Sequence, residues 1–97
     1  MNIKEALVEK VRQSLHGHLQ DPDISLVPDE EFGVLVRVIS PTFEHMDDYD
    51  RQKLVWGRLL EDLNRLERRR LEFVFTNSPS EMEARRLAAR VDSSPAR

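Results

Sequence analysis

The chain has 97 residues, which is enough for one small domain but leaves no room for a second hydrophobic core. Hydrophobic residues make up 39% of the chain and charged residues 34%, which is typical of a globular protein and excludes a wholly disordered one. Cysteine is absent, which excludes disulfides, thiolate catalysis and any metal or iron–sulfur site that the chain would build from its own cysteines.

Charge is distributed unevenly along the chain, although the net charge is only −3. Residues 1–48 hold 4 basic and 10 acidic side chains, whereas residues 49–97 hold 11 basic and 8 acidic ones. A basic C-terminal half is compatible with phosphate binding, but its surplus is small beside the strongly basic patches of dedicated nucleic-acid domains. A solvated arginine face is therefore the alternative interpretation.

The N-terminal sequence indicates a cytoplasmic location. Its first residues, Met-Asn-Ile-Lys-Glu-Ala, lack the apolar stretch of a signal peptide. The longest uninterrupted apolar run, Phe32 to Val36, is far shorter than a membrane span. We therefore expect a cytoplasmic protein.

In the first half of the chain, the pattern predicts a helix followed by a hairpin. Apolar residues recur at steps of three and four over residues 3–15, and Gly17 marks the end of this amphipathic helix. A turn is predicted at residues 20–23, since proline at its third position disfavours helix. The β-branched runs at residues 24–27 and 32–39 then predict an antiparallel hairpin.

Alternation along the second strand assigns its two faces. One face is entirely apolar and is formed by Phe32, Val34, Val36 and Val38. The other face is formed by Leu35, Arg37 and Ile39. Because an arginine on that face has to reach water, we expect helices to cover the valine face only.

The second half begins with a long helix. Pro41 ends the strand, and Asp47, Asp48 and Asp50 suit the N-terminus of the helix that follows, since acids there complement the helix dipole. One arc of this helix is apolar and is predicted to cover the sheet: Val55, Trp56, Leu59, Leu60, Leu63 and Leu66.

A third strand and a last helix complete the predicted domain. Residues 71–75 alternate as a strand, and a strand–helix–strand connection of this length favours parallel pairing with the second strand. Ser78-Pro79-Ser80-Glu81 forms a capping box that starts a final helix with a weak apolar face. The prediction is a single α+β domain over residues 1–91, in the order α-β-β-α-β-α with a three-stranded mixed sheet, and a disordered tail over residues 92–97.

Two short motifs give the chain a family resemblance. Ser40-Pro41-Thr42-Phe43 is followed, after an acidic stretch, by Arg51-Gln52-Lys53-Leu54-Val55-Trp56. This resembles the signature of the BolA family, in which a strand runs into a Ser-x-x-Phe loop and then a helix that opens Arg-His-Arg-Leu-Val. The resemblance covers roughly residues 3–83. Gln52 stands where the family commonly has His.

The resemblance implies a fold like the type II KH domain and a small non-enzymatic protein. Many family members bind monothiol glutaredoxins and share a two-iron cluster with them, and some are linked to transcriptional control. The family's cluster ligand is a His at the start of the third strand, where this chain has Arg68-Arg69-Arg70-Leu71. Guanidinium has no free lone pair at physiological pH and cannot ligate iron, so we expect no cofactor.

We therefore predict an interaction module that docks a cytoplasmic protein, with a monothiol glutaredoxin as the partner that the resemblance suggests. Its surface would combine the loop at 41–53 and the start of the second helix with the arginine-rich entry to the third strand. Phe43 and Arg51 would organise the loop, and the amide of Gln52 would be available to the loop or to a partner. The predicted partner-binding residues are Phe43, Arg51, Gln52, Lys53, Arg68, Arg69 and Arg70.

The alternative is a KH-like nucleic-acid-binding domain of the transcriptional-regulator type. Its phosphate contacts would be Arg51, Lys53, Arg58, Arg65, Arg68, Arg69 and Arg70. The sequence lacks the Gly-x-x-Gly loop with which KH domains clamp a nucleic-acid backbone. A solvated charge run near a helix C-terminus remains open for Arg68 to Arg70.

Metal binding and catalysis find weak support in the sequence. His16-x-His18 has suitable residue types, but the sequence implies no third ligand. His45 lies among Glu44, Asp47 and Asp48, which makes it the best candidate ligand for a divalent cation, and an exposed loop histidine is the alternative. No nucleophile elbow, catalytic triad order or P-loop is present, so we expect no enzyme activity.

Overall fold

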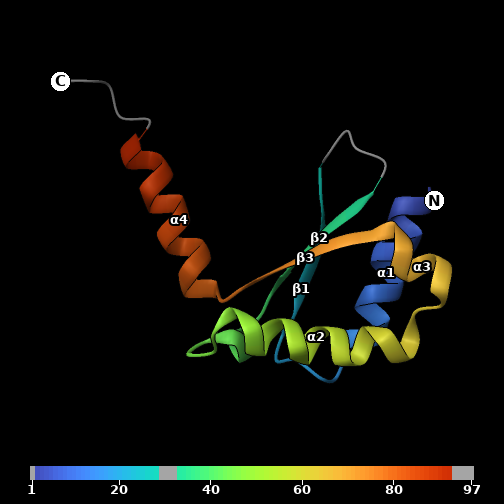
Figure 1. The fold of residues 1–97 in the computed structure, drawn as a ribbon. Helices are drawn as coiled ribbons and strands as arrows, with labels where there is room; N and C mark the ends of the chain where they lie inside the picture. Colours follow the sequence, from blue (N-terminus) through green and yellow to red (C-terminus); the bar gives the residue numbers. More distant parts are fainter. Residues whose placement is uncertain (1, 29–32, 93–97) are drawn as a thin grey trace.

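The computed structural model describes residues 2–28 and 33–92. Its elements follow the chain as α1 (Ile3–Leu15), β1 (Asp23–Val27), β2 (Val34–Ile39), η1 (Pro41–Phe43), α2 (Asp48–Asp62), α3 (Arg65–Arg70), β3 (Leu71–Asn77) and α4 (Pro79–Asp92) (Figure 1). The turn of the predicted hairpin, at residues 28–31, lies outside the described residues from position 29 onward, as do the predicted face position of Phe32 and most of the predicted tail, residues 93–97.

The three strands form one mixed sheet in the order β1-β2-β3. β1 pairs antiparallel with β2, and β3 pairs parallel with β2, as predicted. The register shifts between Val34 and Leu35, where Glu72 of β3 is passed over. Parallel pairing requires a long crossover, and here α2 and α3 supply it.

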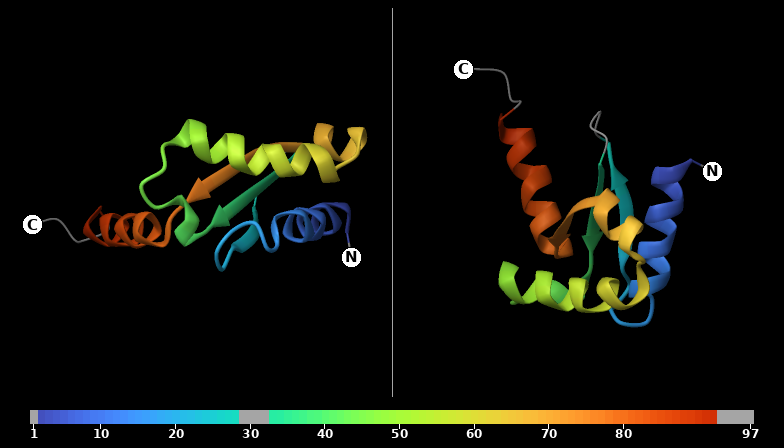
Figure 2. Two further views of the ribbon diagram at one scale, coloured as in Figure 1. Left: turned by 90° about the horizontal axis from the view of Figure 1, so that it is seen from below. Right: turned by 45° about the vertical axis from the view of Figure 1, so that its right-hand side comes forward.

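The predicted faces of the sheet are confirmed for the described residues. Val34, Val36 and Val38 are buried, whereas the residues between them are only partly buried. α1 and α2 both pack on the valine face, with α1 on the β1 side and α2 on the β3 side (Figure 2). Their buried leucines and valines join the sheet in one apolar core, which is the main source of stability in a domain of this size.

The helix after the motif is shorter than predicted. It ends at Asp62, and Leu63 already has an extended backbone. Asn64 then caps a separate helix, α3, by accepting from the backbone N–H of Glu67, while the Glu67 side chain accepts from the backbone N–H of Asn64. The predicted single apolar arc through Leu66 is therefore wrong, because this capping box restarts the helix in a new direction.

Two leucines of that arc are exposed. Val55, Leu59 and Leu63 are buried, whereas Leu60 and Leu66 are largely exposed. Trp56 is partly buried against the core.

The last helix extends away from the body of the molecule (Figure 1). Its predicted capping box is confirmed, since Ser78 and Glu81 exchange bonds between their side chains and backbone amides. Its weak apolar face stays open, and Leu87 is exposed. None of the helices in the described part of the chain is both long and apolar enough to cross a membrane.

Candidate functional site

The Ser-Pro-Thr-Phe motif forms the turn η1 at the end of β2. The buried Ser40 hydroxyl donates to the Gln20 carbonyl at 2.6 Å and accepts from the Thr42 N–H at 3.1 Å. Pro41 occupies the first position of the turn, where its missing N–H costs nothing. Phe43 is completely buried in the core. The motif therefore fixes how the chain leaves the sheet and enters α2.

Arg51 joins this turn to the end of β3 and to α4. Its guanidinium makes five hydrogen bonds, to the Met46 carbonyl (2.9 Å), the Thr76 carbonyl (3.1 Å), the Phe43 carbonyl (2.8 Å) and both carboxylate oxygens of Glu81 (2.7 Å each). Every N–H of a guanidinium is thereby engaged. Arg51 is also only 5% exposed, so it organises the loop as predicted, and its surface is not accessible to a partner or a phosphate.

The Arg51–Glu81 pair perturbs both groups. The hydrogen bonds and charge of Arg51 lower the pKa of the Glu81 carboxyl to about 2, and the Ser78 amide adds to this effect. Bonding to Glu81 in turn raises the pKa of Arg51. A bidentate pair of this kind is stronger than a neutral hydrogen bond, because both partners are ionised. It anchors the first turn of α4 to the start of α2.

Gln52 faces the edge of β3. Its amide nitrogen donates to the Val74 carbonyl at 2.8 Å, and its amide oxygen accepts from the Trp56 indole N–H at 3.1 Å. Together with the Arg51 bond to Thr76, this covers two outward carbonyls of an edge strand that would otherwise be open to pairing. The sequence predicts an amide of Gln52 that is available to the loop or to a partner, but the amide is bonded to β3 and to Trp56 instead.

Lys53 lies on the exposed side of α2. Its amine is 5.9 Å from the centre of the Tyr49 ring, and both side chains are exposed. Near the start of α2, Lys53 is therefore a cation, and Tyr49 an aromatic ring, that solvent can reach. They can be reached by a partner, unlike Phe43 and Arg51.

His45 is exposed and adopts a left-handed backbone, with φ of 65°. Asp47 caps α2 by accepting from the Asp50 N–H at 2.9 Å, so this acid serves the helix. Over residues 2–28 and 33–92, no group of three or more His, Asp or Glu side chains comes together in a way that would hold a metal ion. His16 and His18 are among these residues and take part in no such group.

The arginine run lies in a helix rather than at the start of a strand. Arg68, Arg69 and Arg70 form the last turn of α3 and are exposed, and β3 begins only at Leu71. Cations there are favoured by the helix dipole. The signal for this helix was present in the sequence as Asn64-Arg65-Leu66-Glu67, a capping pattern that the prediction missed.

The predicted docking surface does not come together as one patch. The motif loop meets the first turn of α2, whereas the arginine run follows the last turn of α2, at the opposite end of the helix (Figure 1). A helix of 15 residues is about 21 Å from first to last residue. Of the other predicted phosphate contacts, Arg58 lies near Glu61 (3.6 Å) and Asp62 (3.7 Å), and Arg65 is exposed.

A groove between α1 and α3 lies beside the arginine run. It has a volume of about 340 Å³ and is lined by Ile3, Ala6, Leu7, Lys10, Asn64, Leu66, Glu67 and Arg70. Two of its large apolar side chains are unusually open, with Ile3 61% and Leu66 58% exposed. Lys10 and Glu67 form an ion pair across it at 3.2 Å. Sequence reasoning missed this groove, because it depends on the turn at Asn64.

An iron–sulfur cluster does not fit the residues present. At the entrance to β3, the position that the family resemblance gives to the ligand His, the chain has exposed arginines, which have no lone pair to donate. The chain also has no cysteine. At the entrance to β3, this end of the molecule therefore offers an apolar groove and positive charge, and its arginines cannot ligate iron.

Comparison with known proteins finds two similar solved structures. BolA1 from Arabidopsis thaliana is similar with a TM-score of 0.56 and 25% sequence identity, over 77% of this chain and 94% of that one. A bol-like protein from Babesia bovis is similar with a TM-score of 0.46 and 22% identity, over 89% of this chain and 95% of that one. No protein-family model matches the sequence, and no curated protein matches it.

Proposed function

Because this chain is a BolA-like protein, we propose that it is a non-enzymatic interaction module that docks a cytoplasmic protein and contributes no iron ligand to the complex. The observation that carries the proposal is the groove between α1 and α3. It presents two open apolar side chains, and it lies beside three exposed arginines at the place that the family resemblance gives to the ligand His.

The groove has the features of an anchoring site. Covering a large aliphatic side chain such as Ile3 or Leu66 completely is worth about 1.5–3 kcal/mol, and both are more than half exposed in the free protein. Interfaces take most of their affinity from a few such anchors. An apolar side chain of a partner would pack between Ile3 and Leu66.

The positive charge of the α3 arginines favours an acidic partner. Arg70 lines the groove, and Arg68 and Arg69, which belong to the same turn of α3, line a separate open hollow with Arg65. Lys10 already has Glu67 as its counter-ion, so the unmatched positive charge comes from the arginines. Complementary acids would speed association and fix orientation. We therefore infer that the partner presents an apolar side chain flanked by carboxylates, and the family resemblance makes a monothiol glutaredoxin the first protein to test.

Nucleic acid is the weaker alternative. Of its predicted phosphate contacts, Arg51 is buried against Glu81, and Arg58 has two acids within 4 Å. The remaining exposed cations lie at the two ends of α2 rather than along one surface.

The test is an affinity capture from the native host at two salt concentrations. We expect a protein partner that stays bound at the higher concentration and is lost from the variant with Arg68, Arg69 and Arg70 changed to alanine. The matched control changes Arg85, Arg86 and Arg90 in α4, which removes the same charge from another helix and should leave the partner bound.

Three outcomes would contradict the proposal. Capture of nucleic acid, with a log–log salt slope of about −0.7 to −0.9 per contact, would favour the alternative. Equal loss of the partner from both arginine variants would exclude the groove. A glutaredoxin recovered with an iron–sulfur chromophore that disappears when a histidine of this chain is replaced would show that the chain does supply a ligand.

A further inference from the structure

The face of the sheet opposite α1 and α2 carries an aromatic and cationic cluster. The register of β2 with β3 places Leu35 beside Phe73 and Arg37 beside Phe75. The two phenyl rings are 4.8 Å apart, centre to centre, and meet edge to face at 71°. Phe73 is 46% exposed. The core is complete on the other face of the sheet, so the fold does not require anything to cover this ring. The exposed ring is therefore free to make a further contact.

Arg37 is held in a fixed position within this cluster. Its guanidinium carbon lies 4.9 Å from the centre of the Phe75 ring, and its Nη1 donates to the Asn77 side-chain oxygen at 2.5 Å. The Phe75 ring and the Asn77 side chain are both neutral. Partial burial and the nearby positive charge of Arg85 lower the pKa of Arg37. The guanidinium is thus oriented by its neighbours, and its charge is not compensated by them.

Arg85 brings a second uncompensated guanidinium from α4. Within the described parts of the chain, no carboxylate lies within 4.0 Å of the charged nitrogens of Arg37 or Arg85. The next arginine, Arg86, differs, because it is paired with Glu83. Two like charges held near each other repel, and an anion placed between them would turn that repulsion into attraction.

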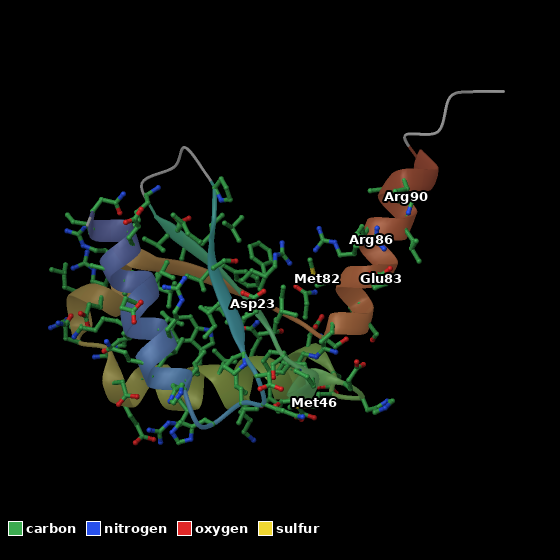
Figure 3. All side chains as sticks on the ribbon, turned by 180° about the vertical axis from the view of Figure 1, so that it is seen from behind. Asp23, Met46, Met82, Glu83, Arg86 and Arg90 are labelled. Atoms are coloured by element: carbon green, nitrogen blue, oxygen red, sulfur yellow. The ribbon has the colours of Figure 1, made fainter. Side chains whose placement is uncertain are left out.

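These groups line a common cavity of about 330 Å³. It combines Arg37, Asn77 and the rings of Phe73 and Phe75 from the sheet with Arg85 from α4 and Asp48 from α2. The volume is that of a small-molecule site. Next to it, Met82 lies on the side of α4 that faces the sheet (Figure 3) and lines an open hollow with Ile39.

We propose that this cavity binds a small organic anion in which a planar apolar group carries a phosphate or a carboxylate. The anionic group binds between the guanidiniums of Arg37 and Arg85, because the forked N–H groups of a guanidinium can bind two oxygens of a carboxylate or of a phosphate at once. The planar group packs on the exposed ring of Phe73. Any part of the ligand that reaches Asp48 has to donate a hydrogen bond. The site is independent of the groove between α1 and α3.

Binding has a mechanical consequence. Arg37 belongs to the sheet and Arg85 to the helix that extends away from it, so a ligand held by both restrains α4 against the sheet. Amide hydrogen exchange in α4 should therefore slow in the complex, and exchange in α1 should not change.

The test is a titration of the labelled protein with four probes, followed by amide NMR shifts. Phenyl phosphate and benzoate represent the two anions on a planar group, inorganic phosphate lacks the ring, and phenol lacks the anion. We expect phenyl phosphate, benzoate or both to bind more tightly than inorganic phosphate and phenol, with shifts around Arg37, Phe73 and Arg85. The tighter of the two identifies the acid. Equal binding of inorganic and phenyl phosphate, or no localised shifts at millimolar concentrations, would overturn the proposal.

Variants separate the site from general attraction to arginine. Arg85→Gln, on an exposed helix position that the fold does not need, should weaken the best probe about tenfold, since it removes a charge-assisted contact. Phe73→Leu should weaken that probe several-fold without affecting inorganic phosphate. Arg69→Gln on α3 is the matched control and should bind like the unchanged protein. Wild-type affinity in Arg85→Gln would refute the site.

Discussion

Replacing Glu81 by glutamine tests the connection between α2 and α4. A glutamine side chain would still accept at the third helical position, so the capping box is retained, while the charge opposite Arg51 and one of the two oxygens that accept from its guanidinium are removed. Arg51, together with the Ser78 amide and the Asn77 side chain, lowers the pKa of Glu81 from 4.5 to about 2, and the whole shift would correspond to about 3 kcal/mol for a buried carboxyl. Because the Glu81 side chain is 43% exposed, solvent screening reduces our expectation to about 1–2 kcal/mol.

The stability difference between Glu81→Gln and the unchanged protein should depend on pH. The folded pKa of Glu81 is depressed, so the carboxylate stabilises the fold fully above pH 4.5, progressively less as the pH falls, and not at all well below pH 2. Glu81→Gln should therefore be less stable than the unchanged protein at pH 7, and the difference should shrink toward pH 2.

Urea unfolding followed by circular dichroism measures this difference. At pH 7 we expect the midpoint for Glu81→Gln to fall by about 1 M, given the urea dependence of small domains. Glu83→Gln is the matched control on the same helix, since Glu83 is exposed and pairs with Arg86 of the same helix, and its midpoint should not change. A difference of the same size at pH 7 and pH 2.5, or equal effects of both substitutions, would refute the reasoning.

Four further substitutions, one of them a control, test the fold. Leu59→Ala should cost about 2–5 kcal/mol of unfolding free energy, because Leu59 is fully buried, whereas Leu60→Ala on the exposed side should stay within about 0.5 kcal/mol; equal costs by urea unfolding would mean that α2 is rotated. Asn64→Ala should cost about 1 kcal/mol by thermal unfolding, through loss of the α3 cap, and no loss would place the helix break elsewhere. Gly17→Ala should cost about 1 kcal/mol in the same assay, since φ is 85° there, and a stabilised variant would contradict that backbone.

Local patterns made much of the fold predictable. The three-and-four spacing over residues 3–15, the alternation of Val34, Val36 and Val38, and the box at Ser78 and Glu81 each report on contacts within one element. Local signals of this kind are confirmed by the structure. The same kind of signal was present at Asn64 and Glu67, but the leucine spacing that runs through Leu66 hid it.

The candidate sites depend on contacts between distant parts of the chain. Glu81 was recognised as a capping residue, but its bond to Arg51 joins residues 30 positions apart, which no periodicity reports. The groove requires Ile3 and Leu66 to meet, and the cavity requires Arg37 and Arg85 to meet. Sequence spacing constrains neither pair, because each is created by the packing of whole elements.

The family-like motif and the candidate surfaces have different roles in this small domain. Phe43, Arg51 and Gln52 are turned inward and hold the loop, the edge of β3 and the start of α4 in place. Exposed groups that can meet other molecules lie elsewhere, in the α1/α3 groove and on the open face of the sheet. Substituting Arg51 would thus disturb binding indirectly, through the fold.

Site-specific photo-crosslinking in the host tests the proposed docking role most directly. A photoreactive phenylalanine analogue at position 66 is placed beside the groove, and the same analogue at position 60 is the control on another exposed leucine position. We predict a crosslink to one protein from position 66 that is abolished when Arg68, Arg69 and Arg70 are alanine, and none from position 60. Crosslinks to nucleic acid, or the same products from both positions, would contradict the account.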